Sequence, residues 1–144
     1  MSQENIAAAR RVIEEAFNQG NLDVIDEVCA ESYTDHDPML GDQDREAAKQ
    51  SIAAYREAFP DLHFEVEDAF AADDKVVIRW TANGTFENSL MGLEPNHEKG
   101  QPIHGIGIDR FEDGKVVESW AQWDTLQFMR DIGAIPSEAS APAA

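Results

Sequence analysis

The stretch from Gly114 to Pro136, G-K-V-V-E-S-W-A-Q-W-D-T-L-Q-F-M-R-D-I-G-A-I-P, decides how the end of the chain folds. Its first half has the period of two of a strand leaving a tight turn, and its second half has a helical period. Asp124 therefore falls at a strand-to-helix junction, beside two tryptophans. A carboxylate in this position is either a helix cap or a catalytic acid/base, because backbone N–H bonds lower a carboxyl pKa whereas burial raises it. Thr125 is an equally good cap, which would free Asp124 for chemistry.

Three amphipathic helices are predicted upstream of this stretch. They run from Ser2 to about Gln19, from the cap Asn21 to about Cys29, and from Arg45 to Phe59. Gly20 ends the first and Pro60 ends the third. The intervening segment E-S-Y-T-D-H-D-P-M-L-G-D is too polar for a core strand and is interpreted as a brief extended piece followed by a loop.

Four strands follow the helices. They run from Leu62 to a turn at 72–74, from Lys75 to Phe86, from Pro102 to Phe111, and from Lys115 to Trp123, with a long loop at 87–101. Helices that precede a run of antiparallel strands indicate an α+β fold, in which the helices cover one face of the sheet. A curved sheet of this kind can enclose a pocket.

Composition limits the classes of protein and partner. The 144 residues fit a single domain, expected over residues 1–136, with a disordered tail at 137–144. The chain carries 29 acidic and 11 basic residues and a formal net charge of −18, which disfavours nucleic acid and anionic membranes as partners. The spread of acids along the chain suggests a solvated surface adapted to high salt.

Neither a signal peptide nor a long apolar run is visible, so we expect a cytoplasmic protein. The single cysteine, Cys29, has no partner for an internal disulfide and is interpreted as a buried hydrophobic residue.

The register of the last hairpin determines which side chains Asp124 can meet. A two-residue turn at Asp113-Gly114 would put Asp124 on one face with Ile103, Gly105 and Gly107. We favour instead a three-residue loop, Glu112-Asp113-Gly114, with Gly114 in the left-handed conformation. Gln122 then opposes His104, Trp120 opposes Ile106, and Asp124 lies diagonal to His104. This face would line the concavity, with Arg110 nearer the turn, and a carboxylate and an imidazole in an apolar site suit general acid/base chemistry.

Other polar residues are candidates for binding a substrate. His36 and Tyr33 lie in the segment Y-T-D-H-D-P, where His36 either reaches a cavity mouth or pairs with a neighbouring aspartate. Trp80 is interpreted as a core residue and pocket wall. No tight metal-ligand spacing, phosphate loop or dinucleotide fingerprint is present, and we expect neither a metal nor another cofactor.

The motifs Y-T-D-H-D-P, F-P-D-L-H-F-E-V-E-D, V-V-I-R-W-T-A-N-G-T and R-F-E-D-G-K-V-V-E-S-W-A-Q-W-D-T-L-Q-F-M-R-D-I-G resemble the SnoaL-like polyketide cyclases of the nuclear-transport-factor-2-like superfamily. The resemblance implies a cone-shaped fold with a curved antiparallel sheet, assembled as homodimers or homotetramers. It also implies a cofactor-free intramolecular aldol closure of a small-molecule carbonyl compound, with Asp124 as general acid/base. His104 and His36 are similar to pocket residues of the family. The segment from Thr85 to Gln101 departs from the family pattern, which leaves the substrate open.

Two other classes remain possible. The same cone could carry a dehydratase, an epoxide hydrolase or a ketosteroid-type isomerase, although Ile108 stands where the acid of an epoxide hydrolase relay would lie. A non-catalytic module for ligand binding or dimerisation would use Asp124 only as a cap.

Overall fold

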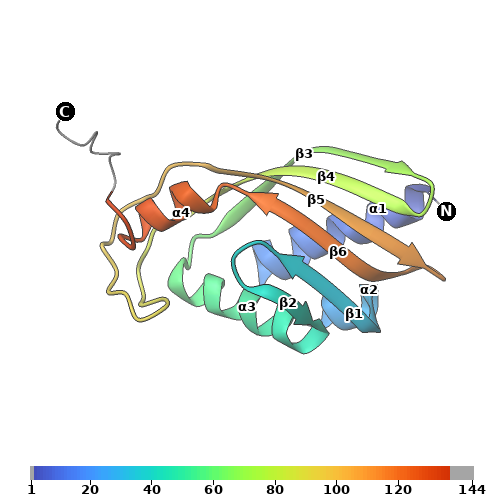
Figure 1. The fold of residues 1–144 in the computed structure, drawn as a ribbon, viewed down its shortest axis with the longest axis horizontal. Helices are drawn as coiled ribbons and strands as arrows, with labels where there is room; N and C mark the ends of the chain where they lie inside the picture. Colours follow the sequence, from blue (N-terminus) through green and yellow to red (C-terminus); the bar gives the residue numbers. More distant parts are fainter. Residues whose placement is uncertain (1, 137–144) are drawn as a thin grey trace.

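In the computed structural model, which describes residues 2–136, helices cover one side of a strongly curved sheet (Figure 1). The tail expected at 137–144 lies outside the described residues. The helices are α1 (Ser2–Arg11), continued by the π-helical turn η1 (Val12–Phe17), α2 (Asp23–Val28), α3 (Arg45–Ala58) and α4 (Thr125–Asp131). The strands are β1 (Cys29–Asp37), β2 (Gly41–Asp44), β3 (His63–Ala72), β4 (Lys75–Asn83), β5 (Ile103–Glu112) and β6 (Lys115–Trp123).

The helices form where the apolar periodicity predicts them. The first ends in a π-helical turn, and Gly20, with a φ of 76°, reverses the chain after it. The third is capped by Asp44, whose side chain accepts a hydrogen bond from the backbone N–H of Ala47 at 2.8 Å. No helix in the described part of the chain is long and apolar enough to cross a membrane.

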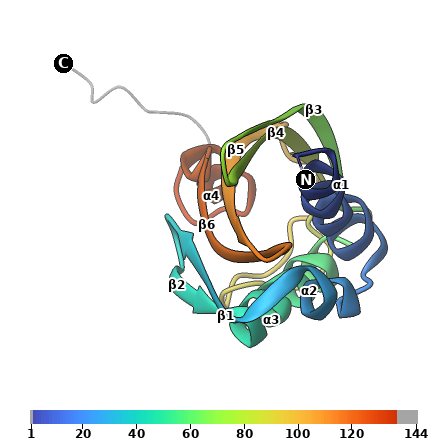
Figure 2. The ribbon, with the colours of Figure 1, turned by 90° about the vertical axis from the view of Figure 1, so that its right-hand side faces the viewer.

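The sheet has the strand order β2-β1-β6-β5-β4-β3, and Figure 2 shows it curving around the interior of the molecule. The α+β cone is confirmed, but the prediction of an antiparallel sheet is wrong in one place, because β1 runs parallel to β6. The segments now seen as β1 and β2 were expected to be an extended piece and a loop. The polarity of β1 misleads because its inward positions, Tyr33, Asp35 and Asp37, line a cavity instead of a dry core.

The predicted three-residue loop of the last hairpin is also wrong. Asp113 and Gly114 have φ values of 50° and 79°, so they form the two central residues of a tight turn with both residues in the left-handed region. A bulge between Arg110 and Phe111 then shifts the register by one residue. Beyond it Trp120 pairs with Ile108, and Gln122 with Ile106. Because of the bulge, Trp120 and Gln122 still share a face with Ile106 and Ile108, as predicted, but each pairs with a residue two positions further along β5 than expected.

Two groups of buried side chains hold the layers together. One packs α1, η1 and α2 against the sheet through residues such as Val24, Val76 and Val116. The other joins the end of α3 to α4 and the β4–β5 loop through Phe59, Phe86 and Phe128. Cys29 belongs to the first group and is 3% exposed, so it is a buried thiol as predicted, and burial raises its pKa to about 12.

Candidate functional site

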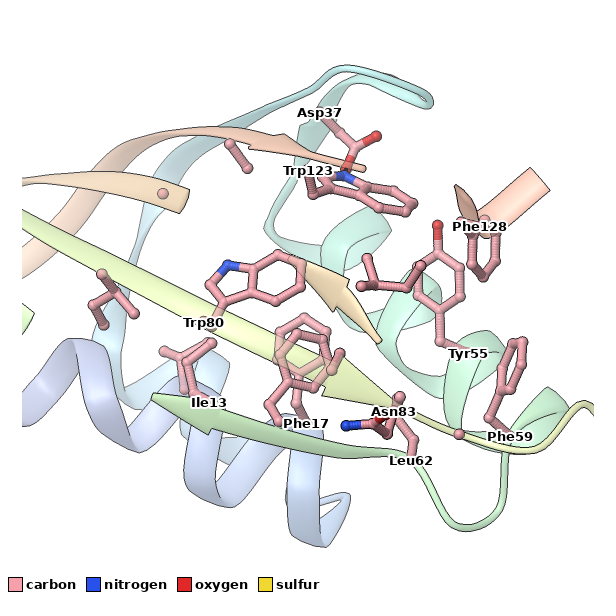
Figure 3. Close-up of a pocket in the computed structure, with 18 of the residues that line it drawn as sticks. Ile13, Phe17, Asp37, Tyr55, Phe59, Leu62, Trp80, Asn83, Trp123 and Phe128 are labelled. Atoms are coloured by element: carbon pink, nitrogen blue, oxygen red, sulfur yellow. Dashed lines mark hydrogen bonds between the residues drawn. The ribbon is translucent and has the colours of Figure 1, made fainter. Parts of the chain in front are cut away.

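A cavity of about 230 Å³ lies between the concave face of the sheet and the helices (Figure 3). Its wall is rich in aromatic side chains, among them Phe17, Tyr55, Phe59, Phe64, Trp80, Trp123 and Phe128. The rings pack against one another, as between Phe64 and Trp80, whose centroids are 4.8 Å apart. Such a wall suits a flat apolar ligand.

Small residues on the concave face make room for the cavity. A Cβ atom built on Gly105 would lie 2.2 Å from Cζ2 of Trp80, its partner on β4, so only glycine lets the indole cross β5. Gly107 and Ala121 pair with each other in the next row and also line the cavity. The curved sheet and its glycines therefore create the hollow together.

The polar end of the cavity is built on three adjacent strands. Asp35 of β1 pairs in register with Ser119 of β6, and Ser119 pairs with Asp109 of β5. The Ser119 hydroxyl donates a hydrogen bond to Oδ1 of Asp109 at 2.5 Å. The two acids therefore flank Ser119 in one row, with about 10 Å between their backbones. The same three residues border a second cavity of about 100 Å³ behind the first.

Burial raises the pKa values of Asp35 and Asp109 towards neutral pH. Desolvation, and then the negative charges of Asp37 and Asp109, raise the pKa of Asp35 to about 7. Desolvation raises the pKa of Asp109 to about 6, against the opposing effect of the Ser119 hydrogen bond. Two acids with pKa values near neutrality can supply both a proton acceptor and a proton donor at physiological pH.

Two further polar groups lie near this end. Trp123 directs its indole N–H at Oδ2 of Asp37 across 3.4 Å, as Figure 3 shows. The other carboxylate oxygen of Asp37 accepts the backbone N–H groups of Met39 and Leu40, both at 2.8 Å. The hydroxyl of Tyr55 is buried and has no hydrogen-bond partner among the described residues. It is available to a ligand.

The structure places Asp124 and His104 on the other side of the sheet from the cavity. Asp124 is the N-cap of α4, where its carboxylate accepts the backbone N–H of Gln127 at 3.0 Å. His104 lies opposite it and accepts the backbone N–H of Asp124 through its carbonyl, and both residues are exposed. The expectation that their face lines the concavity is wrong, because that face is the convex one. Whether either residue takes part in catalysis stays a prediction.

The other predicted residues divide between the two faces. Gln122 is exposed on the convex face, and Trp120, although it touches the cavity wall, is 36% exposed and stacks on the His36 ring at 5.6 Å. Tyr33 and Trp80 lie in the cavity wall. Their roles in binding stay predictions.

His36 belongs to a charged network on the convex face. Its Nδ1 lies 2.7 Å from Asp42 and its Nε2 lies 2.7 Å from Glu118, which also pairs with Arg110. The hydrogen bonds to Glu118 and then to Asp42 raise the pKa of His36. The interpretation of His36 as a residue paired with a neighbouring acid is therefore closer to the structure than a position at the cavity mouth. Its partners, however, are Asp42 and Glu118 and not the adjacent aspartates.

The long loop between β4 and β5 borders the cavity. Asn96 donates a side-chain hydrogen bond to the backbone carbonyl of Asp131 at 2.8 Å, and a Cβ on Gly100 would lie 2.4 Å from the Asp131 carboxylate. Gly100, Gln101 and Asp131 line the cavity. Within residues 2–136, no group of three or more histidine, cysteine, aspartate or glutamate side chains is arranged to hold a metal ion.

Sequence reasoning missed Asp35 and Asp109. Asp109 alternates with the selected positions His104 and Arg110 on β5, and Asp35 alternates with His36 on β1, although it shares a face with the selected Tyr33. The signal that could have found them is the run of small residues, Gly105, Gly107 and Ala121, because a hollow face needs small side chains where a flat core needs large ones.

Comparison with known proteins agrees with the fold. The family model of the SnoaL-like polyketide cyclases matches residues 7–132. Among solved structures, AclR from Streptomyces galilaeus, a proposed hydroxylase, is 24% identical with a TM-score of 0.84, over 97% of this chain and 87% of AclR. IdmH from Streptomyces antibioticus, a proposed polyketide cyclase, is 25% identical with a TM-score of 0.77, over 90% of this chain and 98% of IdmH. No curated protein sequence matches significantly. With the family model spanning most of its length, the chain belongs to the SnoaL-like polyketide cyclases.

Proposed function

We propose that the protein is a cofactor-free cyclase or isomerase that carries out acid/base chemistry on a small apolar carbonyl compound. The reaction is an intramolecular aldol-type closure or a related proton transfer. The observation that carries this proposal is the row Asp35–Ser119–Asp109 at the end of an aromatic cavity, with the pKa values of the two acids raised to about 7 and about 6.

The two acids suit complementary roles. Asp109 has the lower pKa and is therefore the more fully ionised of the two at neutral pH, so it serves as the base and takes the proton from the carbon next to the substrate carbonyl. Asp35 has the higher pKa and donates its proton to the oxygen that becomes negatively charged. One C–H bond of the substrate breaks and one O–H bond forms, and in a closure one C–C bond forms as the π bond of the accepting carbonyl breaks. Asp109 is then protonated and Asp35 ionised, and a proton that passes from Asp109 to Asp35 through solvent restores both, so the step balances without a cofactor.

Exchange of carbon-bound protons tests this assignment without knowledge of the natural substrate. The probe is 2-tetralone in D2O, and the loss of its α-proton signal is followed by NMR. We expect the protein to accelerate the exchange, and Asp109→Asn to remove about 100-fold or more of that acceleration. Asp124→Asn is the matched control, because asparagine keeps the helix cap.

The opposite pattern would favour the site predicted from the sequence. If Asp124→Asn or His104→Gln abolished the exchange while Asp109→Asn and Asp35→Asn left it intact, the catalytic centre would lie on the convex face. If the wild-type protein caused no exchange, the alternative of a non-catalytic ligand-binding module would be favoured.

The family resemblance also leads us to propose a homodimer or homotetramer in the cytoplasm. The convex face exposes Ile106 (46%) and Trp120 (36%), which lie in adjacent strands and offer an apolar contact. Light scattering with size-exclusion chromatography tests the assembly, and a monomer at high concentration would contradict it.

A further inference from the structure

The cavity is an acidic site in which no cation balances the charge. Its wall includes Asp35, Asp37, Asp109 and Asp131, and no lysine, arginine or histidine lines it or the smaller cavity behind it, within residues 2–136. The ion pairs found in this part of the chain include neither Asp35 nor Asp109. The ring of His36 lies next to Asp35 in sequence but is held by Asp42 and Glu118 on the convex face.

The rest of the wall is suited to a positive charge as well. Trp80, Trp123, Tyr33 and Tyr55 line the same cavity as the acids, and aromatic faces attract an ammonium group. The Tyr55 hydroxyl is buried without a partner and can accept a hydrogen bond from an N–H donor. An anionic ligand would have to approach carboxylates in a site with no compensating base.

We propose that the cavity selects a ligand that carries a protonated amine, held at the acidic end of the cavity among Asp35, Asp37 and Asp109, with its apolar rings against the aromatic wall. This inference rests on the proposed function and specifies its substrate class, an apolar carbonyl compound with a basic nitrogen. The geometry that supports it is the gathering of these carboxyl groups at one end of a cavity whose wall, within residues 2–136, includes no basic side chain.

Three probes with the same two-ring body and different charge test the proposal. They are 2-naphthylmethylamine, 2-naphthylmethanol and 2-naphthoate, titrated against the full chain near neutral pH with calorimetry or amide NMR. We expect the amine to bind at least about 10-fold more tightly than the alcohol, and the carboxylate to bind most weakly. A salt concentration of about 0.15 M limits attraction by the acidic surface, because the Debye length is then about 8 Å.

Matched variants separate the cavity from the surface. Asp109→Asn and Asp35→Asn, made separately so that one variant suffices if the other does not fold, should remove most of the preference for the amine while the alcohol still binds. Glu67→Gln removes one charge from an exposed position and should leave the preference unchanged.

Each other outcome overturns the inference. If the alcohol binds as tightly as the amine, the site takes neutral ligands, and the proposed acid/base function still stands. If the carboxylate binds most tightly, or if Glu67→Gln reduces the preference as much as Asp109→Asn does, the cavity does not recognise a cation. If no probe binds and 2-tetralone does not exchange, the proposed function fails together with the inference.

Discussion

Ionisation of the buried Asp109 should lower the free energy of unfolding as the pH rises above about 4. Its pKa is raised from 3.8 to about 6 because burial disfavours the charged form. A folded-state pKa that is raised for an acid means that the folded protein holds the proton more tightly than the unfolded chain. The cost of ionisation is therefore absent below about pH 4, grows as the pH rises, and is complete above about pH 7.

The size of the effect follows from the two pKa values. A difference of about 2 corresponds to about 3 kcal/mol, since each pKa unit is about 1.4 kcal/mol. Asp109→Asn keeps the shape of the side chain and an oxygen that accepts the Ser119 hydrogen bond, but it cannot ionise. We therefore expect this variant to be more stable than the wild type by up to about 3 kcal/mol at about pH 8, and by roughly half that at about pH 5.

Urea unfolding at the two pH values measures the difference. Glu67→Gln is the control for the general relief of repulsion in a chain with a net charge of −18, and its effect should be small and similar at both pH values. If Asp109→Asn gave the same stability difference at pH 5 and pH 8, or destabilised the protein at pH 8, burial of an ionisable carboxyl at this position would be refuted.

Four further predictions concern the frame around the site. Gly105→Ala should destabilise the protein by about 1–3 kcal/mol and shift tryptophan fluorescence, because the added methyl group meets Trp80. Gly107→Ala is the control, because the nearest atom to its Cβ is the carbonyl oxygen of Trp120 at 3.4 Å, and equal losses of stability in the two variants would contradict this prediction. The raised pKa of His36 means that its stabilising contribution is present below about pH 6.5 and is lost as the pH rises through the folded-state value. The difference in stability between the wild type and His36→Gln should therefore narrow as the pH rises above about 6.5, and a constant difference would count against the network. Asp124→Ala should cost about 1 kcal/mol while Asp124→Asn costs little, and equal losses would show that the cap contributes nothing. Molar salt should raise the melting temperature, because screening weakens repulsion among the 29 acidic residues; an unchanged melting temperature would argue against a high-salt adaptation.

Local patterns predicted most of the fold. Helical spacing identified α3 together with its stop at Pro60, and alternation identified β6 to the residue. These predictions are correct because each element packs one face against a dry core, and that face therefore consists of apolar residues at regular spacing. The parallel pairing of β1 with β6 joins segments far apart in the chain, and no local pattern encodes that contact.

The site was harder to predict than the fold because its interior reverses the usual rule. On β5 and β6 the large apolar residues Ile106 and Trp120 face outward, whereas Gly107 and Asp109 line the cavity and Gly105 lies beneath the Trp80 indole. A face chosen for its apolar residues is therefore the wrong one here. The error in the hairpin register did not change which residues share a face, because the bulge at Arg110 shifts the pairing by one further residue.

The measurement that tests the central claim most directly is a titration of the aspartate side-chain carboxyl carbons by NMR, assigned with Asp109→Asn and Asp35→Asn. We expect midpoints of about 6 for Asp109 and about 7 for Asp35. Midpoints below about 4 for both residues, the ordinary range of an exposed aspartate, would contradict the assignment of this pair as the acid/base centre.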